Sequence, residues 1–135
     1  MNIFLNANII LDLIDIDRGS VKITKERLKK HMLNGAVFYT SCNIFTNVYY
    51  VASKNINYTK VIQELEKILT FVEIVVIDID IINSAIKISK EENHKDLEDI
   101  LQYICAKVSG CKLIITNDKS FYSKDIEIIS INKGR

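Results

Sequence analysis

Short apolar runs alternate along the chain with longer stretches in which apolar residues recur every three or four positions. The short runs have the length of β-strands and lie at residues 2–5, 36–41, 73–78, 112–116 and 126–131. The longer stretches predict helices at residues 7–16, 24–33, 43–54, 59–72, 80–92 and 96–110. Because strands that alternate with helices favour a parallel sheet covered on both faces, we expect a single α/β domain over residues 1–135.

Two of the expected helices carry specific predictions about burial. The helix at 96–110 has the clearest apolar face, which consists of Leu97, Ile100, Leu101, Ile104, Cys105 and Val108. The helix at 7–16 carries Asp12 and Asp15 three residues apart. Since this spacing places both carboxylates on one side of a helix, we expect them on its more polar, solvent-facing side.

Composition limits the functional classes less than the motifs do. Hydrophobic residues make up 48% of the 135-residue chain, which is enough for one domain with a packed core. The formal net charge of +1 provides no overall attraction to nucleic acid, so any basic surface must be local. No apolar run approaches the ~18 residues of a membrane span. Three cysteines without metal-ligand spacing, and no secretory signal, favour buried thiols and a cytoplasmic protein.

Polar residues gather where the first and fourth strands are expected to end. They are Asn6 and Asn8 after the first strand, and Thr116, Asn117 and Asp118 after the fourth. In open α/β sheets, ligands bind outside the carboxyl ends of the strands, so these side chains are candidates for a site. Asn and Asp are also common in ordinary turns, and this simpler interpretation stays open at this point.

Acidic residues begin the helix at 96–110. Asp96 and Asp99 are three residues apart, with Glu98 between them, so both aspartates can project from one face, as a metal site requires. Carboxylates also stabilise a helix start through the helix dipole. For Asp96 alone, helix stabilisation and metal binding are equally compatible with the sequence.

Three segments resemble the characteristic parts of PIN-domain nucleases. They are IFLNANIILDLID at residues 3–15, FYTSCNIFTNVYYVASK at 38–54 and DLEDILQYICAKVSGCKLIITNDKSF at 96–121. The segments occur in the family's order and at fitting spacing, and they are most similar to the toxin-like branch related to VapC. The resemblance implies a PIN-like three-layer α/β/α sandwich with a central, mainly parallel sheet of about five strands, in agreement with the α/β class expected from periodicity.

The resemblance transfers the family's four acidic positions, in chain order, to Asn6, Asn47, Asp99 and Asp118. Asp99 and Asp118 are then the expected metal ligands, with Asn6 and Asp96 as further candidates. Thr116 and Asn8 match the small polar residues that support the family's site.

The resemblance implies a toxin of a toxin–antitoxin pair that hydrolyses RNA with Mg²⁺ or Mn²⁺, cations that prefer carboxylate oxygen. It also implies a homodimer and a small antitoxin partner. This chain departs from the pattern because two acidic positions are amides, and Asn6 matters most, since the first aspartate is the family's most dependable residue. A loss of ~2.7 kcal/mol in metal binding or transition-state stabilisation is about a hundredfold, so we expect weak or absent cleavage.

Two other functions compete with this hypothesis. A catalytically silent PIN domain could act as a binding or regulatory protein, with Asp99 and Asp118 as remnants. A phospho-receiver domain shares the α/β class but requires paired acids after the first strand, where this chain reads FLNAN. Asn6 itself fits either a natural loss of the aspartate or a deliberate change that silences a ribonuclease harmful to its host.

Overall fold

The computed structural model describes residues 1–15 and 21–131. Its sheet has five parallel strands in the order β3-β2-β1-β4-β5. The strands are β1 (Asn2–Leu5), β2 (Val37–Ser41), β3 (Val72–Val75), β4 (Leu113–Ile115) and β5 (Glu127–Ile129). The helices are α1 (Ala7–Ile14), α2 (Val21–Leu33), α3 (Ile44–Ala52), α4 (Tyr58–Ile68), α5 (Ile79–Glu92) and α6 (Leu97–Val108). Every predicted strand and helix is therefore present, with shifted ends.

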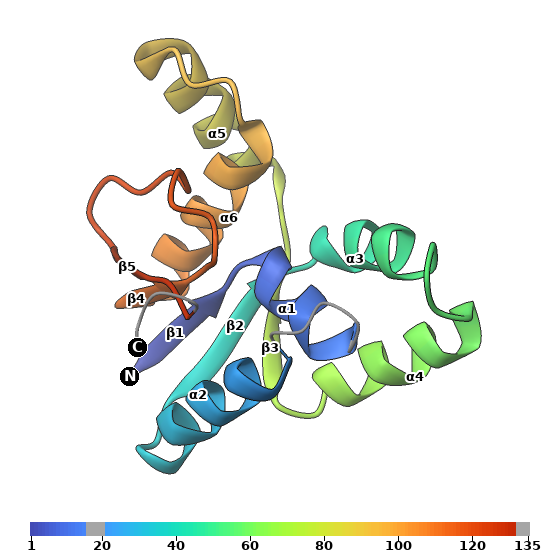
Figure 1. Ribbon diagram of the computed structural model, residues 1–135. Coiled ribbons are helices and arrows are strands. Elements are labelled where there is room, and N and C mark those ends of the chain that lie inside the picture. Colours follow the sequence, from blue (N-terminus) through green and yellow to red (C-terminus); the bar gives the residue numbers. More distant parts are fainter. Residues whose placement is uncertain (16–20, 132–135) are drawn as a thin grey trace.

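Helices cover both faces of the sheet, with α1 to α4 on one side and α5 and α6 on the other (Figure 1). The alternation of side chains along β1 produces this division. Ile3 and Leu5 pack against α1 to α4, whereas Phe4 packs against α5 and α6, together with Ile114 of β4. The predicted three-layer α/β/α sandwich is confirmed, and each face of the sheet has its own hydrophobic core.

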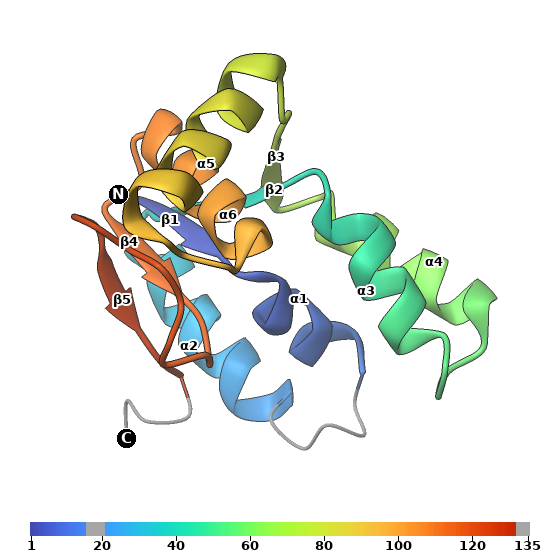
Figure 2. The ribbon, with the colours of Figure 1, turned by 90° about the horizontal axis from the view of Figure 1, so that it is seen from above.

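The carboxyl ends of β1 and β4 lie side by side at one edge of the sheet. Leu5 pairs with Ile115, and the N–H of Asn6 donates to the Ile115 carbonyl at 3.1 Å. The chain runs from β1 outward to β2 and β3 and then returns to β4, so a topological switch point lies between β1 and β4. Figure 2 shows the starts of α1 and α6 close to each other at this edge. Ligands bind at such switch points in open α/β sheets.

The prediction that Asp12 and Asp15 face solvent is wrong. Their exposed fractions are 1% and 4%. The Asp12 carboxylate accepts hydrogen bonds from Asn117 Nδ2 at 2.9 Å and from the Thr24 hydroxyl at 3.5 Å. The reason is that α1 is packed against α2, α3 and α4 and meets the loop after β4, so its polar side is covered as well as its apolar side.

Some helix ends also differ from the prediction. α2 begins at Val21 rather than at residue 24, and α1 ends at Ile14, while the predicted end at residue 16 lies outside the described residues. On α6, Leu97 and Val108 are 41% and 62% exposed, contrary to the predicted apolar face, because they occupy the two ends of the helix. Among the described residues, no helix is both long and apolar enough to cross a membrane.

The cysteines follow the prediction in two cases out of three. Cys105 and Cys111 are buried, and burial raises the pKa of each thiol to about 12. Cys42 is exposed, which contradicts the prediction. It directly follows the last residue of β2, where the chain leaves the sheet.

Candidate active site

Asn6 and Thr116 meet where β1 and β4 end. The Thr116 hydroxyl donates a hydrogen bond to Asn6 Oδ1 at 3.0 Å. Its oxygen accepts from Asn8 Nδ2 at 3.3 Å and from the N–H of Asp118 at 3.1 Å. Thr116 is fully buried, and these contacts satisfy its hydroxyl. Thr116 therefore joins the start of α1 to the loop that carries Asp118.

The other end of the Asn6 amide contacts Gln102 of α6. Asn6 Nδ2 donates to Gln102 Oε1 at 2.7 Å, and the N–H of Ala7 donates to the same oxygen at 3.3 Å. Asn6 precedes α1, yet its side chain does not cap that helix. Sequence reasoning missed Gln102. The signal that could have found it is a strongly polar residue three positions after Asp99, within an otherwise apolar stretch of helix.

Asp99 lies in the first turn of α6, surrounded by other carboxylates, and is 9% exposed. Burial, followed by the negative charges of Asp96, Asp118 and Glu98, raises the pKa of Asp99 from 3.8 to about 7. Burial and the charge of Asp96 also raise the pKa of Glu98. The start of α6 is thus a cluster of acids that disfavour one another's charged forms.

Asp96 and Asn47 have the simplest roles in this region. Asp96 is the N-cap of α6, and its Oδ1 accepts a hydrogen bond from the N–H of Asp99 at 3.1 Å. The helix-stabilising interpretation of Asp96 is therefore correct. Asn47 projects from α3, and its Nδ2 donates to Glu98 Oε1 at 3.4 Å. This contact places the second acidic position of the motif opposite the start of α6.

Most of the side chains described in this region line one pocket of about 240 Å³. Its walls come from the start of α1, from Asn47 of α3 and from the start and first turns of α6. Five of the seven residues proposed from the sequence contribute to the lining, namely Asn6, Asn8, Asn47, Asp96 and Asp99. Thr116 and Asp118 are not part of the lining. They adjoin it, since Thr116 bonds to Asn6 and the charge of Asp118 acts on Asp99.

Comparison with known sequences now decides the family. Residues 3–127 match the PIN domain. The chain is also 38% identical over 129 residues to Ribonuclease VapC1 of Aquifex aeolicus (strain VF5), a match that covers 95% of this chain and 89% of that protein. The chain belongs to the PIN-domain family. This membership replaces the phospho-receiver hypothesis.

Solved structures share the PIN fold at low sequence identity. A chain of VapBC-1 from nontypeable Haemophilus influenzae is similar with a TM-score of 0.71 and 19% identity, over 98% of this chain and 100% of that chain. VapC20 of Mycobacterium tuberculosis, described as a Sarcin-Ricin loop cleaving toxin, is similar with a TM-score of 0.69 and 14% identity, over 88% and 92%. These likenesses establish the fold alone.

PIN-domain ribonucleases depend on metal ions, so the donors of this PIN site can be compared with what a metal requires. The pocket is lined by amide and carboxylate oxygens, which hard divalent cations prefer. Within residues 1–15 and 21–131, however, no three Asp, Glu, His or Cys side chains lie close enough together to hold a metal ion. The oxygen atoms of this pocket are therefore suitable ligands for a divalent cation, but too few of them belong to carboxylates that lie close together.

Proposed function

We propose that this protein is a metal-dependent endoribonuclease of the VapC toxin type, in which Asn6 weakens the cleavage of RNA. The observation that carries the proposal is the 38% identity to Ribonuclease VapC1 across 95% of the chain. The geometry supports it, because Asn6 and Asp99 line one pocket at the switch point of the sheet. Residues 1–135 act in this proposal as one PIN domain in the cytoplasm.

In this proposal Asp99 and Asp118 are the carboxylates that would hold Mg²⁺ or Mn²⁺, and they would hold it weakly because the other two acidic positions are amides. When bound, the ion would supply an activated water molecule and charge neutralisation at the leaving oxygen of the phosphodiester. Asp96 positions Asp99 by accepting its N–H, and Thr116 positions Asp118 in the same way. Burial raises the pKa of Asp99 most, and the neighbouring negative charges that raise this pKa further would favour the arrival of a cation among these acids.

Asn6 is the reason to expect weak cleavage. An amide has nearly the shape of a carboxylate but lacks its unit charge, which near a divalent ion contributes on the order of several kcal/mol before desolvation is subtracted. A net loss of ~2.7 kcal/mol slows a reaction about a hundredfold. The contacts support the same conclusion, because the end of the amide that faces Gln102 is Nδ2, a hydrogen-bond donor that cannot ligate a cation.

The test compares cleavage of a structured RNA by the native chain, Asn6→Asp and Asn34→Asp, each with Mg²⁺, Mn²⁺ or EDTA. Asn34 is exposed after α2 and does not line the pocket, so its replacement adds the same charge elsewhere. We expect Asn6→Asp to cleave about a hundredfold faster than the native chain, and Asn34→Asp to cleave at the rate of the native chain. If Asn6→Asp cleaves RNA no faster than the native chain, the proposal that Asn6 weakens cleavage is wrong. If no variant shows cleavage that EDTA abolishes, the proposal of a metal-dependent ribonuclease is wrong.

A binding or regulatory role without catalysis is the second candidate. The observation that favours it is the Asn6 amide, which is buried and hydrogen-bonded at both ends, as expected of a structural residue. In that case RNA binds the native chain and Asn6→Asp with equal affinity in fluorescence anisotropy, and neither cleaves it with any metal. A cleavage product from Asn6→Asp would exclude this candidate.

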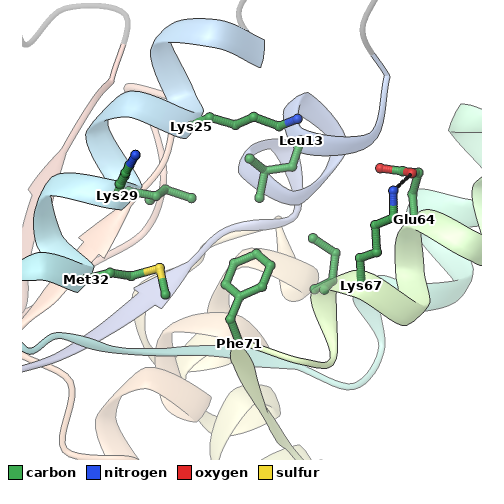
Figure 3. A pocket seen from close by; sticks show the side chains of 9 residues that line it. Leu13, Lys25, Lys29, Met32, Glu64, Lys67 and Phe71 are labelled. Carbon is green, nitrogen blue, oxygen red and sulfur yellow. Dashed lines mark hydrogen bonds and ion pairs between the residues drawn. The ribbon is translucent and has the colours of Figure 1, made fainter.

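We also propose a small antitoxin partner, as in the VapBC complexes that this fold resembles. A groove of about 340 Å³ between α1, α2 and α4 has an apolar floor that includes Leu13, Met32 and Phe71. Figure 3 shows Lys25 and Lys29 of α2 beside this floor. Such a surface suits an amphipathic segment with acidic residues.

The antitoxin proposal is tested by coexpression with the product of the neighbouring gene, followed by size-exclusion chromatography. We expect the partner to form a complex with Asn6→Asp and to inhibit its cleavage of RNA. The double replacement Lys25→Glu/Lys29→Glu should weaken the binding of the partner, because like charges then meet at the groove. A complex of unchanged stability would show that the partner binds a different surface.

The homodimer is proposed from an apolar face on α5. Ile79, Ile82 and Ile86 follow helical spacing and are 65%, 38% and 45% exposed. Exposed apolar patches of this kind mark protein interfaces, and a second copy of the chain fits the family. Light scattering should give twice the chain mass for the native protein and a single chain mass for Ile82→Glu. Equal masses for the two would contradict this interface.

A further inference from the structure

Gln102 is a strongly polar side chain in the interior, and the acidic motif of the family does not include it. It is 1% exposed and belongs to the largest fully buried side chains of the described residues. Buried amides need hydrogen-bond partners, and Gln102 Oε1 finds two at the start of α1, the N–H of Ala7 and the Nδ2 of Asn6. Gln102 is therefore the link between α6 and the first acidic position of the motif.

The direction of these hydrogen bonds is determined from both ends by backbone N–H groups, which can only donate. The N–H of Asp118 donates to Thr116 Oγ1, and Thr116 in turn donates its proton to Asn6 Oδ1. At the other end, the N–H of Ala7 donates to Gln102 Oε1, which leaves that oxygen to accept from Asn6 Nδ2. The side chain at position 6 must therefore accept one hydrogen bond and donate another, and an amide can do both.

A carboxylate at position 6 would change this arrangement. Its second oxygen would face Gln102 Oε1 across the 2.7 Å that now separates a donor from an acceptor. The contact becomes favourable when the Gln102 amide turns over, so that its Nε2 donates to the carboxylate. That rotation gives up the bond to Ala7, which is the longer of the two at 3.3 Å. Gln102 can thus hold either an amide or a carboxylate, by opposite ends of its own amide.

We propose that Gln102 is the positioning residue for position 6. In the native chain its oxygen holds the Asn6 amide against Thr116, and in a chain with aspartate at position 6 its nitrogen would hold the carboxylate in place as a ligand for the metal. The second half of this inference rests on the proposed function, whereas the first half concerns the metal-free protein. A hydrogen-bonded partner of this kind typically changes metal affinity by about 10–100-fold.

The first test is a double-mutant cycle in EDTA at pH 8, measured by thermal unfolding. Gln102→Glu keeps an acceptor for Asn6 and Ala7, and Asn6→Asp is accommodated by rotation of Gln102, so each single variant folds. The double variant places two carboxylates in contact, and its midpoint should fall about 5 °C or more below the sum of the single shifts. Additive shifts would overturn the proposal, because the two side chains would then be independent.

The second test measures Mn²⁺ binding by calorimetry in the Asn6→Asp background. Gln102→Met keeps the size of the side chain but cannot hydrogen-bond, and it should weaken Mn²⁺ binding about tenfold. Ile104→Val, a packing change on the same helix, should leave the affinity unchanged. Equal affinities with and without the Gln102→Met replacement would overturn the positioning role.

The outcomes separate this inference from the proposed function. If Asn6→Asp binds Mn²⁺ but does not cleave RNA, the ribonuclease proposal fails. The effect of Gln102→Met on the affinity for Mn²⁺ still decides whether Gln102 positions residue 6. If Asn6→Asp does not bind Mn²⁺, the metal role of both residues fails. The metal-free cycle then decides whether Gln102 holds Asn6 in the native chain.

Discussion

Two of the three walls of the PIN pocket hold their polar groups in opposite ways. The wall at the start of α6, here called the acidic wall, carries acids whose burial and mutual repulsion raise the pKa values of Asp99 and Glu98. The wall at the start of α1, here called the amide wall, carries Asn6, whose amide is hydrogen-bonded at both ends. The acidic wall carries carboxyl groups that a cation would stabilise in their charged form, whereas the polar atoms of the Asn6 side chain already have hydrogen-bond partners within the protein. The two walls of one pocket therefore differ in what a bound cation would change.

The largest effect is expected from the replacement of Asp99 in a chain that already carries Asn6→Asp. In the Asn6→Asp background, Asp99→Asn should slow RNA cleavage about a hundredfold or more, because it removes one of the carboxylates proposed to hold the metal. Asp80→Asn, which removes an exposed acid of α5, is the matched control and should have no effect. Initial rates with Mn²⁺ measure both. Similar rates for Asp99→Asn and Asp80→Asn would show that Asp99 takes no part in catalysis.

The amide wall can be tested through Thr116. Thr116→Val should destabilise the protein by about 2–3 kcal/mol, since Asn6 Oδ1 loses its donor and Asn8 and Asp118 lose an acceptor. Thr40→Val is the control, because Thr40 is equally buried but its hydroxyl donates to the Leu5 carbonyl at 2.8 Å, and the loss of this bond should cost ~1 kcal/mol. Urea unfolding of the two variants gives the comparison. Equal losses would mean that the Thr116 network adds nothing beyond one bond.

The acidic wall should also be visible in the pH dependence of stability. The pKa of Asp99 is raised from 3.8 to about 7 in the folded protein, so between these values the folded state binds more protons than the unfolded state. Stability from this group is therefore present below about pH 4 and is lost as the pH rises to about 7. Relative to the native chain, Asp99→Asn should gain on the order of 1 kcal/mol between pH 4.5 and pH 7.5, measured by thermal unfolding. Parallel pH profiles of the two proteins would contradict this.

The smallest effect is expected at Asn47, which projects from α3 and contacts Glu98 of α6 near solvent. Asn47→Asp replaces the hydrogen bond to Glu98 with repulsion between two carboxylates. Because Asn47 is exposed, the loss of stability should be about 0.5 kcal/mol or less and should disappear in high salt. Thermal unfolding at low and high NaCl concentrations measures it. A loss that persists at high salt would have to come from something other than charge.

Local pattern in the sequence was sufficient for the position of the pocket. Asn6 and Thr116 could be assigned to the same edge of the sheet in advance because parallel strands have their carboxyl ends at one edge. That β1 and β4 are neighbours was shown only by the structure. Asp96 and Asp99 could be placed on one face because three residues make almost one helical turn. Burial of Asp12 could not be predicted in this way. It depends on Asn117, which lies 105 positions away along the chain.

By itself, the sequence determined the alternation of strands and helices, the parallel sheet and the PIN family, because periodicity and motif order are properties of the chain read in one direction. The tertiary structure alone decided that Asn6 is held between Thr116 and Gln102, 110 and 96 positions away. It alone decided that the buried carboxyl of Asp99 lies within reach of the charges of Asp96, Asp118 and Glu98. Hydrogen bonds and the electrostatic field at a buried carboxyl depend on side chains from distant segments, and only folding brings those segments together.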